Sequence, residues 1–264
     1  MTERHTIIFV GAGPGDPDLI TVKGQKALAA ADLVVYAGSL VPEAVLKWAR
    51  PEAERINSAG MHLDQILAAM ADAQRQGKRV VRLHTGDPSL YGAIYEQMAE
   101  LERRDIPYEV IPGVTAAFAA AATLGIEFTL PEVSQTLILT RMAGRTPVPE
   151  AESLRALAAH RASMAIYLSM SLIGRVAEIL QEAYGPSATC AVVYRASHPD
   201  EQVIVTQLKD LAQQVAAAGI ERQAVILVGR VLDVGKDELK HKSKLYDREF
   251  EHGYRAGKKQ EPND

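Results

Sequence analysis

The stretch that decides the fold reads TIIFVGAGPGDP, at residues 6–17. Its first five residues are β-branched or apolar and predict a short buried strand. Gly11, Gly13 and Gly15 follow directly, and a helical pattern resumes at residues 22–31. Glycines between a strand and a helix let the backbone approach a ligand closely. The stretch therefore predicts a strand, a candidate ligand turn and a helix.

The rest of the first half repeats this alternation. Apolar runs at residues 33–36 and 80–83 predict strands, and residues 62–75 and 91–103 have helical patterns. The alanine-rich stretch at 110–126 is too short and too weakly apolar to span a membrane and predicts a buried helix. Repeated strand–helix units predict a mostly parallel sheet covered by helices.

A boundary is expected near Pro131, because proline cannot continue a helix and a fresh strand pattern begins at 136. The second half predicts strands and helices in turn: strands at 136–140, 164–168, 189–194, 202–205 and 224–228, and helices at 150–160, 172–183 and 208–217. Two of those strands follow one another without a helix, which predicts a mixed sheet. We therefore expect two α/β domains, at 1–131 and 132–235, and a charged tail at 236–264.

Composition excludes several classes of protein. With 47% hydrophobic and 23% charged residues among 264, the chain is neither disordered nor fibrous. A net charge of −4 argues against a nucleic-acid partner. The single cysteine, Cys190, allows no intrachain disulfide and is expected to be a buried thiol in a reducing, cytoplasmic protein. No secretory leader pattern, membrane span or metal-site motif is found, so neither membrane nor metal binding is expected.

Three interpretations of the first glycine turn remain open. A dinucleotide-binding loop would have glycine where Asp16 stands and an acid at the end of the second strand, where the chain has Tyr36, Ala37 and Gly38. A methyltransferase loop is matched by the three glycines, although glycine spacing alone is a weak signal. A tight turn without any ligand is the third.

Two more strand ends carry glycine turns. Residues 83–92 read LHTGDPSLYG, and residues 111–116 read IPGVTA at the start of the alanine-rich helix. Asp-Pro-Ser before a helix is also a common N-terminal cap. Three such strand ends in one half of the chain nevertheless predict a shared binding cleft, since ligands of α/β sheets bind where parallel strands end.

Five ordered motifs resemble the signatures of the tetrapyrrole methylases: VGAGPGDP at 10–17, GDP at 86–88, PGVTA at 112–116, YLSM at 167–170 and GRV at 229–231. The resemblance runs from residue 6 to residue 232. It implies an enzyme that uses S-adenosylmethionine (SAM), releases S-adenosylhomocysteine, and methylates a tetrapyrrole of cobalamin or sirohaem synthesis. It also implies two α/β domains with SAM in the cleft between them, and a homodimer.

Within that family, YAGSLV at 36–41, NSAGM at 57–61 and the tail at 245–255 resemble the branch that methylates C-11 of precorrin-4. Uroporphyrinogen methylases have an acidic residue where Ala37 stands, so no catalytic residue is carried over. Another precorrin or uroporphyrinogen-III methyltransferase of this family is one alternative. A flavin- or nicotinamide-dependent oxidoreductase and a non-enzymatic sensor are the others.

The resemblance places SAM contacts, mostly through backbone atoms, at ten positions: Pro14, Thr85, Gly86, Asp87, Leu90, Thr115, Ala116, Leu168, Met170 and Ala196. The substrate would carry acetate and propionate carboxylates, which arginine binds well. Arg82, Arg141 and Arg195 lie near predicted strand ends and are expected to bind them, with ordinary surface salt bridges as the alternative. Strand alternation puts His84 on the same face as Arg82. Ser39 completes the expected substrate contacts.

Overall fold

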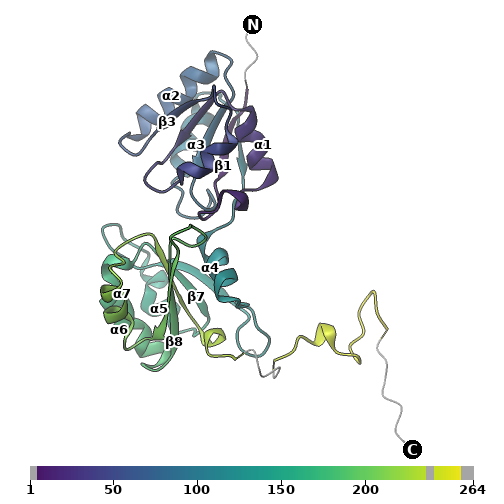
Figure 1. Ribbon diagram of the computed structural model, residues 1–264, viewed down its shortest axis with the longest axis vertical. Helices are drawn as coiled ribbons and strands as arrows, with labels where there is room; N and C mark the ends of the chain where they lie inside the picture. The colour runs from purple at the N-terminus through teal and green to yellow at the C-terminus, as the bar shows by residue number, and fades with distance from the viewer. Residues whose placement is uncertain (1–4, 236–240, 257–264) are drawn as a thin grey trace, which may run out of the picture. The chain divides into compact units, whose positions relative to one another are not determined.

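The computed structural model describes residues 5–235 and 241–256, and its packing forms two compact units (Figure 1). Of the described residues, the first unit contains 5–123 together with Arg195–Gln202, and the second contains Leu124–Tyr194, 203–235 and 241–256. The domain boundary expected between residues 131 and 132 stays a prediction, because packing alone does not say which segments fold independently.

The first unit contains a parallel five-stranded sheet in the order β3-β2-β4-β1-β5. Its strands are β1 (Ile7–Gly11), β2 (Leu33–Tyr36), β3 (Glu54–Asn57), β4 (Val80–His84) and β5 (Tyr108–Ile111). Its helices are α1 (Val22–Ala30), α2 (Leu63–Arg75), α3 (Tyr95–Arg103) and α4 (Ala116–Leu124), with 3-10 turns at Pro17–Leu19 and Glu43–Trp48. The predicted parallel sheet with helical cover is confirmed.

Alternate residues of these strands face two separate apolar cores. On one face Val10, Val34 and Val81 pack with α1 and the 3-10 helix Glu43–Trp48. On the other face Phe9 and Val80 pack with α2 and α3. Both faces of the sheet are therefore buried, which explains why β1 and β2 are nearly continuous apolar runs rather than alternating ones, whereas β4 also carries Arg82 and His84.

Two local predictions for this unit were wrong. The helix expected from residue 91 begins only at Tyr95, because Tyr91 and Ala93 have left-handed backbone, with φ of 57° and 50°. Strand β3 was not predicted, since its sequence, ERIN, has only one apolar residue. It is an edge strand paired with β2 alone, so backbone pairing rather than core packing places it there.

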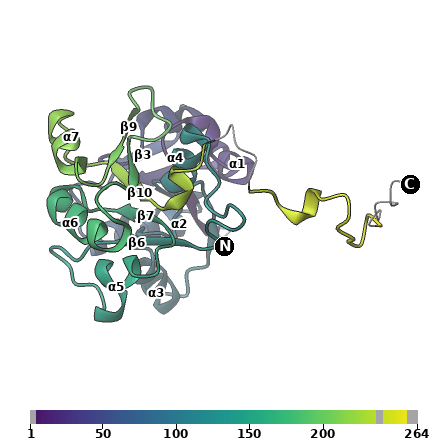
Figure 2. The same ribbon diagram turned by 90° about the horizontal axis from the view of Figure 1, so that it is seen from below.

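The second unit contains the predicted mixed sheet, in the order β6-β7-β10-β8-β9. Its elements are β6 (Leu137–Arg141), α5 (Leu154–Ala158), β7 (Ser163–Tyr167), α6 (Ile173–Tyr184), β8 (Thr189–Tyr194), β9 (Gln202–Gln207), α7 (Leu211–Ala217) and β10 (Ala224–Val228). Strand β6 runs parallel to β7, whereas β10 is antiparallel to both β7 and β8. Helices α5, α6 and α7 share one core with this sheet (Figure 2).

Three details of the second unit bear on the sequence predictions. The helix expected at 150–160 is split, because the Ser153 hydroxyl caps a new helix by accepting from the N–H of Ala156. The Cys190 thiol is fully buried, and that burial raises its pKa to about 12, so it is an unreactive core residue. Of the predicted tail, residues 241–256 are described, with one 3-10 turn at Lys244–Tyr246, and the rest lies outside the described residues.

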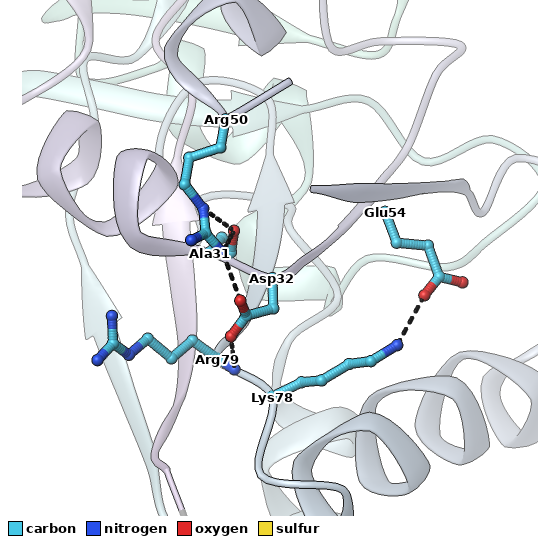
Figure 3. A network of polar contacts seen from close by, with 6 residues as sticks. All are labelled: Ala31, Asp32, Arg50, Glu54, Lys78 and Arg79. Carbon is cyan, nitrogen blue, oxygen red and sulfur yellow. Dashed lines mark hydrogen bonds and ion pairs between the residues drawn. The ribbon is translucent and has the colours of Figure 1, made fainter. Parts of the chain in front are cut away.

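Charged groups bridge the amino-terminal ends of three neighbouring strands of the first unit (Figure 3). The Asp32 carboxylate, just before β2, accepts from the N–H of Arg79, just before β4, at 2.8 Å. The Arg50 guanidinium pairs with Asp32 and donates to the carbonyl of Ala31. The hydrogen bond from Arg79 is the main cause that lowers the pKa of Asp32; partial burial opposes it, and Arg50 adds to it.

We expect Asp32→Ala to lower the free energy of unfolding by about 1 kcal/mol at pH 7, because it leaves the Arg79 N–H and the Arg50 side chain without their acceptor. The folded-state pKa lies below the ordinary 3.8, so the carboxylate contributes fully above that value and loses its contribution as the pH falls through the folded pKa. Urea unfolding at pH 7 and at the lowest pH where the protein stays folded measures this. Asp72→Ala, in an exposed pair with Arg75, is the control and should change little.

Candidate active site

Three glycine turns meet where β1, β4 and β5 end, at what we term the carboxyl edge of the first sheet. A Cβ atom on Gly113 would lie 2.1 Å from the carbonyl oxygen of Gly86 and 2.8 Å from Cα of Gly11. A Cβ on Gly11 would lie 2.6 Å from the backbone of Gly113. Real side chains do not come so close, so these backbones approach one another only because the residues are glycine.

Hydrogen bonds continue the sheet into the turns. The N–H of Ala12 donates to the carbonyl of His84 at 2.7 Å, and Gly13 and Gly86 exchange backbone bonds in an isolated bridge. Both glycines have left-handed backbone, with φ of 81° and 60°. A Cβ on Gly86 would meet no atom closer than 3.7 Å, the Cα of Thr115. The backbone of Gly86 is thus less crowded on this side than that of Gly11 or Gly113, which suits close approach of a ligand.

The Asp87 carboxylate locks two of these turns together. One oxygen accepts from the N–H of Gly113 at 2.8 Å, and the other accepts from the N–H and hydroxyl of Ser89. Burial raises the pKa of Asp87, but the hydrogen bonds from Ser89 and Gly113 outweigh it, so the pKa lies below its ordinary value. Asp87 is consequently ionised at neutral pH and fastens the β4 turn to the β5 turn.

A distant segment packs against the first glycine turn. We term Arg195–Gln202, which connects β8 to β9, the return segment; its contacts make it part of the first unit. The Ser197 hydroxyl accepts from the N–H of Asp16 at 2.9 Å, and the His198 ring occupies the space next to Gly15. Burial is the main cause that lowers the pKa of His198, so the ring is neutral at pH 7. The first glycine turn is therefore held by the β4 turn, through Gly86, and by the return segment, through Ser197.

Arg82 and His84 lie on the same buried face of β4, each with 5% of its surface exposed. The His84 ring stacks on Phe9, and burial, with a smaller contribution from Arg82, lowers the pKa of His84 to about 3. Arg82 donates to Gln97, to Ser58 and to the carbonyl of Val35. The assignment of Arg82 to a substrate carboxylate stays a prediction, and the burial of the Arg82 side chain disfavours it.

The structure places the expected SAM residues of the first unit close to the carboxyl edge: Pro14, Thr85, Gly86, Asp87, Leu90, Thr115 and Ala116 follow strand ends, and Ala196 lies in the return segment against Gly15. Ser39 follows β2 and is exposed. Arg195 pairs with Asp200 and contacts the His198 ring. The assignments of these residues to SAM and substrate stay predictions.

Leu168, Met170 and Arg141 belong to the second unit and are described within it. Leu168 combines left-handed backbone, φ 51°, with 69% exposure, a strained and exposed apolar residue of the kind found at ligand sites. Met170 is buried. Arg141 donates to the carbonyls of Thr146 and Pro147 and so shapes its own loop.

Sequence reasoning missed the partners of Arg82 and of the first glycine turn. Gln97 and Ser58 are buried polar residues on α3 and after β3, and the only signal for them was an arginine inside an apolar strand, which requires buried acceptors. No feature of the sequence indicated that Ser197 would contact the first glycine turn. Among the described residues no group of three or more His, Cys, Asp or Glu side chains is arranged to hold a metal ion, and no helix there is long and apolar enough to cross a membrane.

A parallel sheet with ligand turns at its carboxyl edge, joined to a mixed α/β unit, is the architecture of a small-molecule-binding α/β enzyme. The family model for tetrapyrrole (corrin/porphyrin) methylases matches residues 6–212. The chain belongs to this family.

Two relatives are similar to this chain over nearly their whole length. It is 52% identical over 260 residues to a cobalt-precorrin-4 C(11)-methyltransferase of Methanocaldococcus jannaschii, covering 98% of this chain and 99% of the relative. It is 50% identical over 252 residues to a precorrin-4 C(11)-methyltransferase of Pseudomonas aeruginosa, covering 96% and 99%.

Solved structures agree in fold. The X-ray structure of a cobalt-precorrin-4 methyltransferase is similar with a TM-score of 0.84 and 49% identity, covering 87% of this chain and 96% of that one. The uroporphyrin-III C-methyltransferase of Thermus thermophilus complexed with S-adenosylhomocysteine is similar with a TM-score of 0.73 and 27% identity, covering 89% and 97%. The predicted fold class and family resemblance are confirmed.

We expect Gly113→Ala to destabilise the protein by about 3 kcal/mol or more, because the new methyl group would overlap the Gly86 carbonyl and force the turns apart. Gly60→Ala is the matched control, since a Cβ there meets nothing within 4 Å. Chemical denaturation of both variants measures the difference. Equal stability of the two would show that the turns are not in contact.

Proposed function

We propose that this protein is a SAM-dependent methyltransferase that methylates C-11 of precorrin-4, or of its cobalt complex, and so forms precorrin-5 in cobalamin biosynthesis. The observation that carries the proposal is about 50% identity, over nearly the whole of both chains, to enzymes named for that reaction. The 27% identity to a uroporphyrin-III methyltransferase makes that reaction the weaker candidate.

The carboxyl edge supplies the features that a SAM site requires. Gly86 offers a backbone that is less crowded than that of Gly11 or Gly113, and Asp87 fixes that turn against Gly113. The proposed contacts in the first unit are Pro14, Thr85, Gly86, Asp87, Leu90, Thr115, Ala116 and Ala196. Both Asp87 oxygens accept hydrogen bonds from the protein, so we assign that side chain to shaping the turn and the backbone around it to holding the ligand.

The reaction places modest demands on protein side chains. SAM supplies an electrophilic methyl group, whose bond to sulfur breaks as a ring carbon of the reduced tetrapyrrole forms the new carbon–carbon bond. The products are S-adenosylhomocysteine and the methylated ring system. The protein must hold the carbon in line with the methyl group and exclude water, which is a task for rigid turns. Ala37 cannot move a proton, so no acid at that position takes part.

The resemblance implies a homodimer, and the single cysteine favours a reducing, cytoplasmic setting; we propose both for this protein. Sedimentation of the purified chain tests the dimer directly: a monomer at micromolar concentration would contradict it.

The decisive experiment incubates the protein with methyl-labelled SAM and, separately, precorrin-4, cobalt-precorrin-4 and uroporphyrinogen III. We expect label at C-11 of one or both precorrin-4 forms, located by carbon NMR of the product. Label only in uroporphyrinogen would support the second candidate. Methyl transfer to none of the three, with a bound flavin or nicotinamide in the purified protein, would support an oxidoreductase instead.

We expect Gly86→Val to weaken binding of S-adenosylhomocysteine at least tenfold, because its side chain would project into the space that borders the turn. Gly219→Val is the matched control: Gly219 has nearly the same left-handed φ, 66° against 60°, and open surroundings, but lies after α7 in the second unit. Calorimetric titration should show unchanged affinity in the control. Equal affinity in both variants would remove Gly86 from the site.

A further inference from the structure

We propose that Arg82 is a positioning residue that, through Gln97 and Ser58, fixes the two loops following β4 and β2 at the carboxyl edge. Those loops carry Asp87, Leu90 and Ser39 of the proposed sites, so the inference rests on the proposed function and deepens it. The role differs from the binding of a substrate carboxylate, which burial of Arg82 disfavours.

Arg82 is a buried cation whose partners are neutral. Its Nε donates to the Gln97 side chain at 3.1 Å, and its Nη1 donates to the Ser58 hydroxyl at 3.0 Å and to the Val35 carbonyl at 3.3 Å. Within the described residues no carboxylate pairs with it. Burying a charge without a counter-charge is costly, so a leucine would serve a purely structural core better. Arg82 therefore acts through the side chains that accept its hydrogen bonds, Gln97 and Ser58.

The first branch is the set of hydrogen bonds that leads from Arg82 through Gln97 to the loop after β4. A guanidinium only donates hydrogen bonds, so the Gln97 amide must present its oxygen to Arg82 and turn its NH₂ group the other way. That group donates to the carbonyl of Ala93 at 2.8 Å. Ala93 has left-handed backbone. A Cβ atom on the neighbouring Gly92 would lie 2.1 Å from the carbonyl oxygen of Pro88, so only glycine fits there. Arg82 thus sets the orientation of the amide that holds a strained loop.

The second branch runs to the loop after β2. Because Arg82 donates to it, the Ser58 hydroxyl directs its own hydrogen to the carbonyl of Tyr36, at 3.1 Å. The adjacent Asn57 side chain accepts from the N–H of Gly38 at 3.1 Å. One guanidinium consequently fixes the donor direction of both Gln97 and Ser58, whereas the first part of the loop after β4 is also held by the hydrogen bond between Asp87 and Gly113.

Gln97→Glu tests the first branch. The carboxylate still accepts from Arg82 and supplies its missing counter-charge, but it cannot donate to Ala93 and repels that carbonyl. We expect thermal stability equal to or above that of the wild type and S-adenosylhomocysteine affinity within about threefold of it. We expect kcat for precorrin-4 at least tenfold lower, and faster amide hydrogen exchange at residues 88–95. A role in stability alone would not lower kcat while stability is kept.

Gln74→Met is the control, because it removes the corresponding buried donor without burying an unpaired carboxylate. Gln74 is as buried as Gln97, with 2% against 4% exposed, and likewise donates to a backbone carbonyl, that of His5 at 3.1 Å, but it lies on α2 away from these loops. Its kcat and its exchange at 88–95 should match the wild type. Wild-type kcat and exchange in Gln97→Glu would overturn the inference. If the wild type itself methylates no precorrin, the proposed function fails, and the exchange experiment still decides the role of Arg82.

Discussion

The backbones of Gly11, Gly86 and Gly113 touch at the carboxyl edge, where neither Gly11 nor Gly113 has space for a Cβ atom, and the first unit is arranged around that contact. It aligns the ends of β1, β4 and β5, which are neighbours in the sheet although β4 and β5 are distant from β1 in sequence. Because backbone atoms fill the contact, few polar side chains are needed there. The site is consequently defined by glycine, alanine and proline, with Asp87 as its fastening.

Charge is distributed differently at the two ends of the same strands. At the amino-terminal ends, Asp32, Arg50, Lys78 and Glu54 form exposed pairs that stabilise the sheet without enclosing any space. At the carboxyl edge the one deeply buried cation, Arg82, meets only neutral acceptors in the described structure. The exposed ion pairs and the glycine turns of the proposed site therefore lie at opposite edges of the sheet, and ligands of open α/β sheets bind at the carboxyl edge.

Most of the fold followed from periodicity, and the failures have physical causes. Strands such as β2, β8 and β10 are uninterrupted apolar runs, and their bounds were predicted correctly. Local patterns did not reveal β3, whose pairing rather than its composition makes it a strand, or the left-handed residues before α3. The family and the carboxyl-edge turns were recognisable because glycine motifs are local in sequence. The partners of Arg82 were not, since Ser58 precedes it by 24 residues and Gln97 follows it by 15.

Because the return segment is synthesised late, the first unit cannot complete its folding until most of the chain has been made. The hydrogen bond between Asp16 and Ser197 joins residues 181 positions apart, so the first glycine turn cannot be closed when its own strands emerge from the ribosome. Domains generally fold as they are synthesised, N-terminal first, yet this one must wait for a piece that lies between two strands of the second sheet. Until then the first glycine turn of the nascent first unit lacks its contact with Ser197, and nascent chains stalled before Arg195 should leave that turn incomplete however well their sheet is formed.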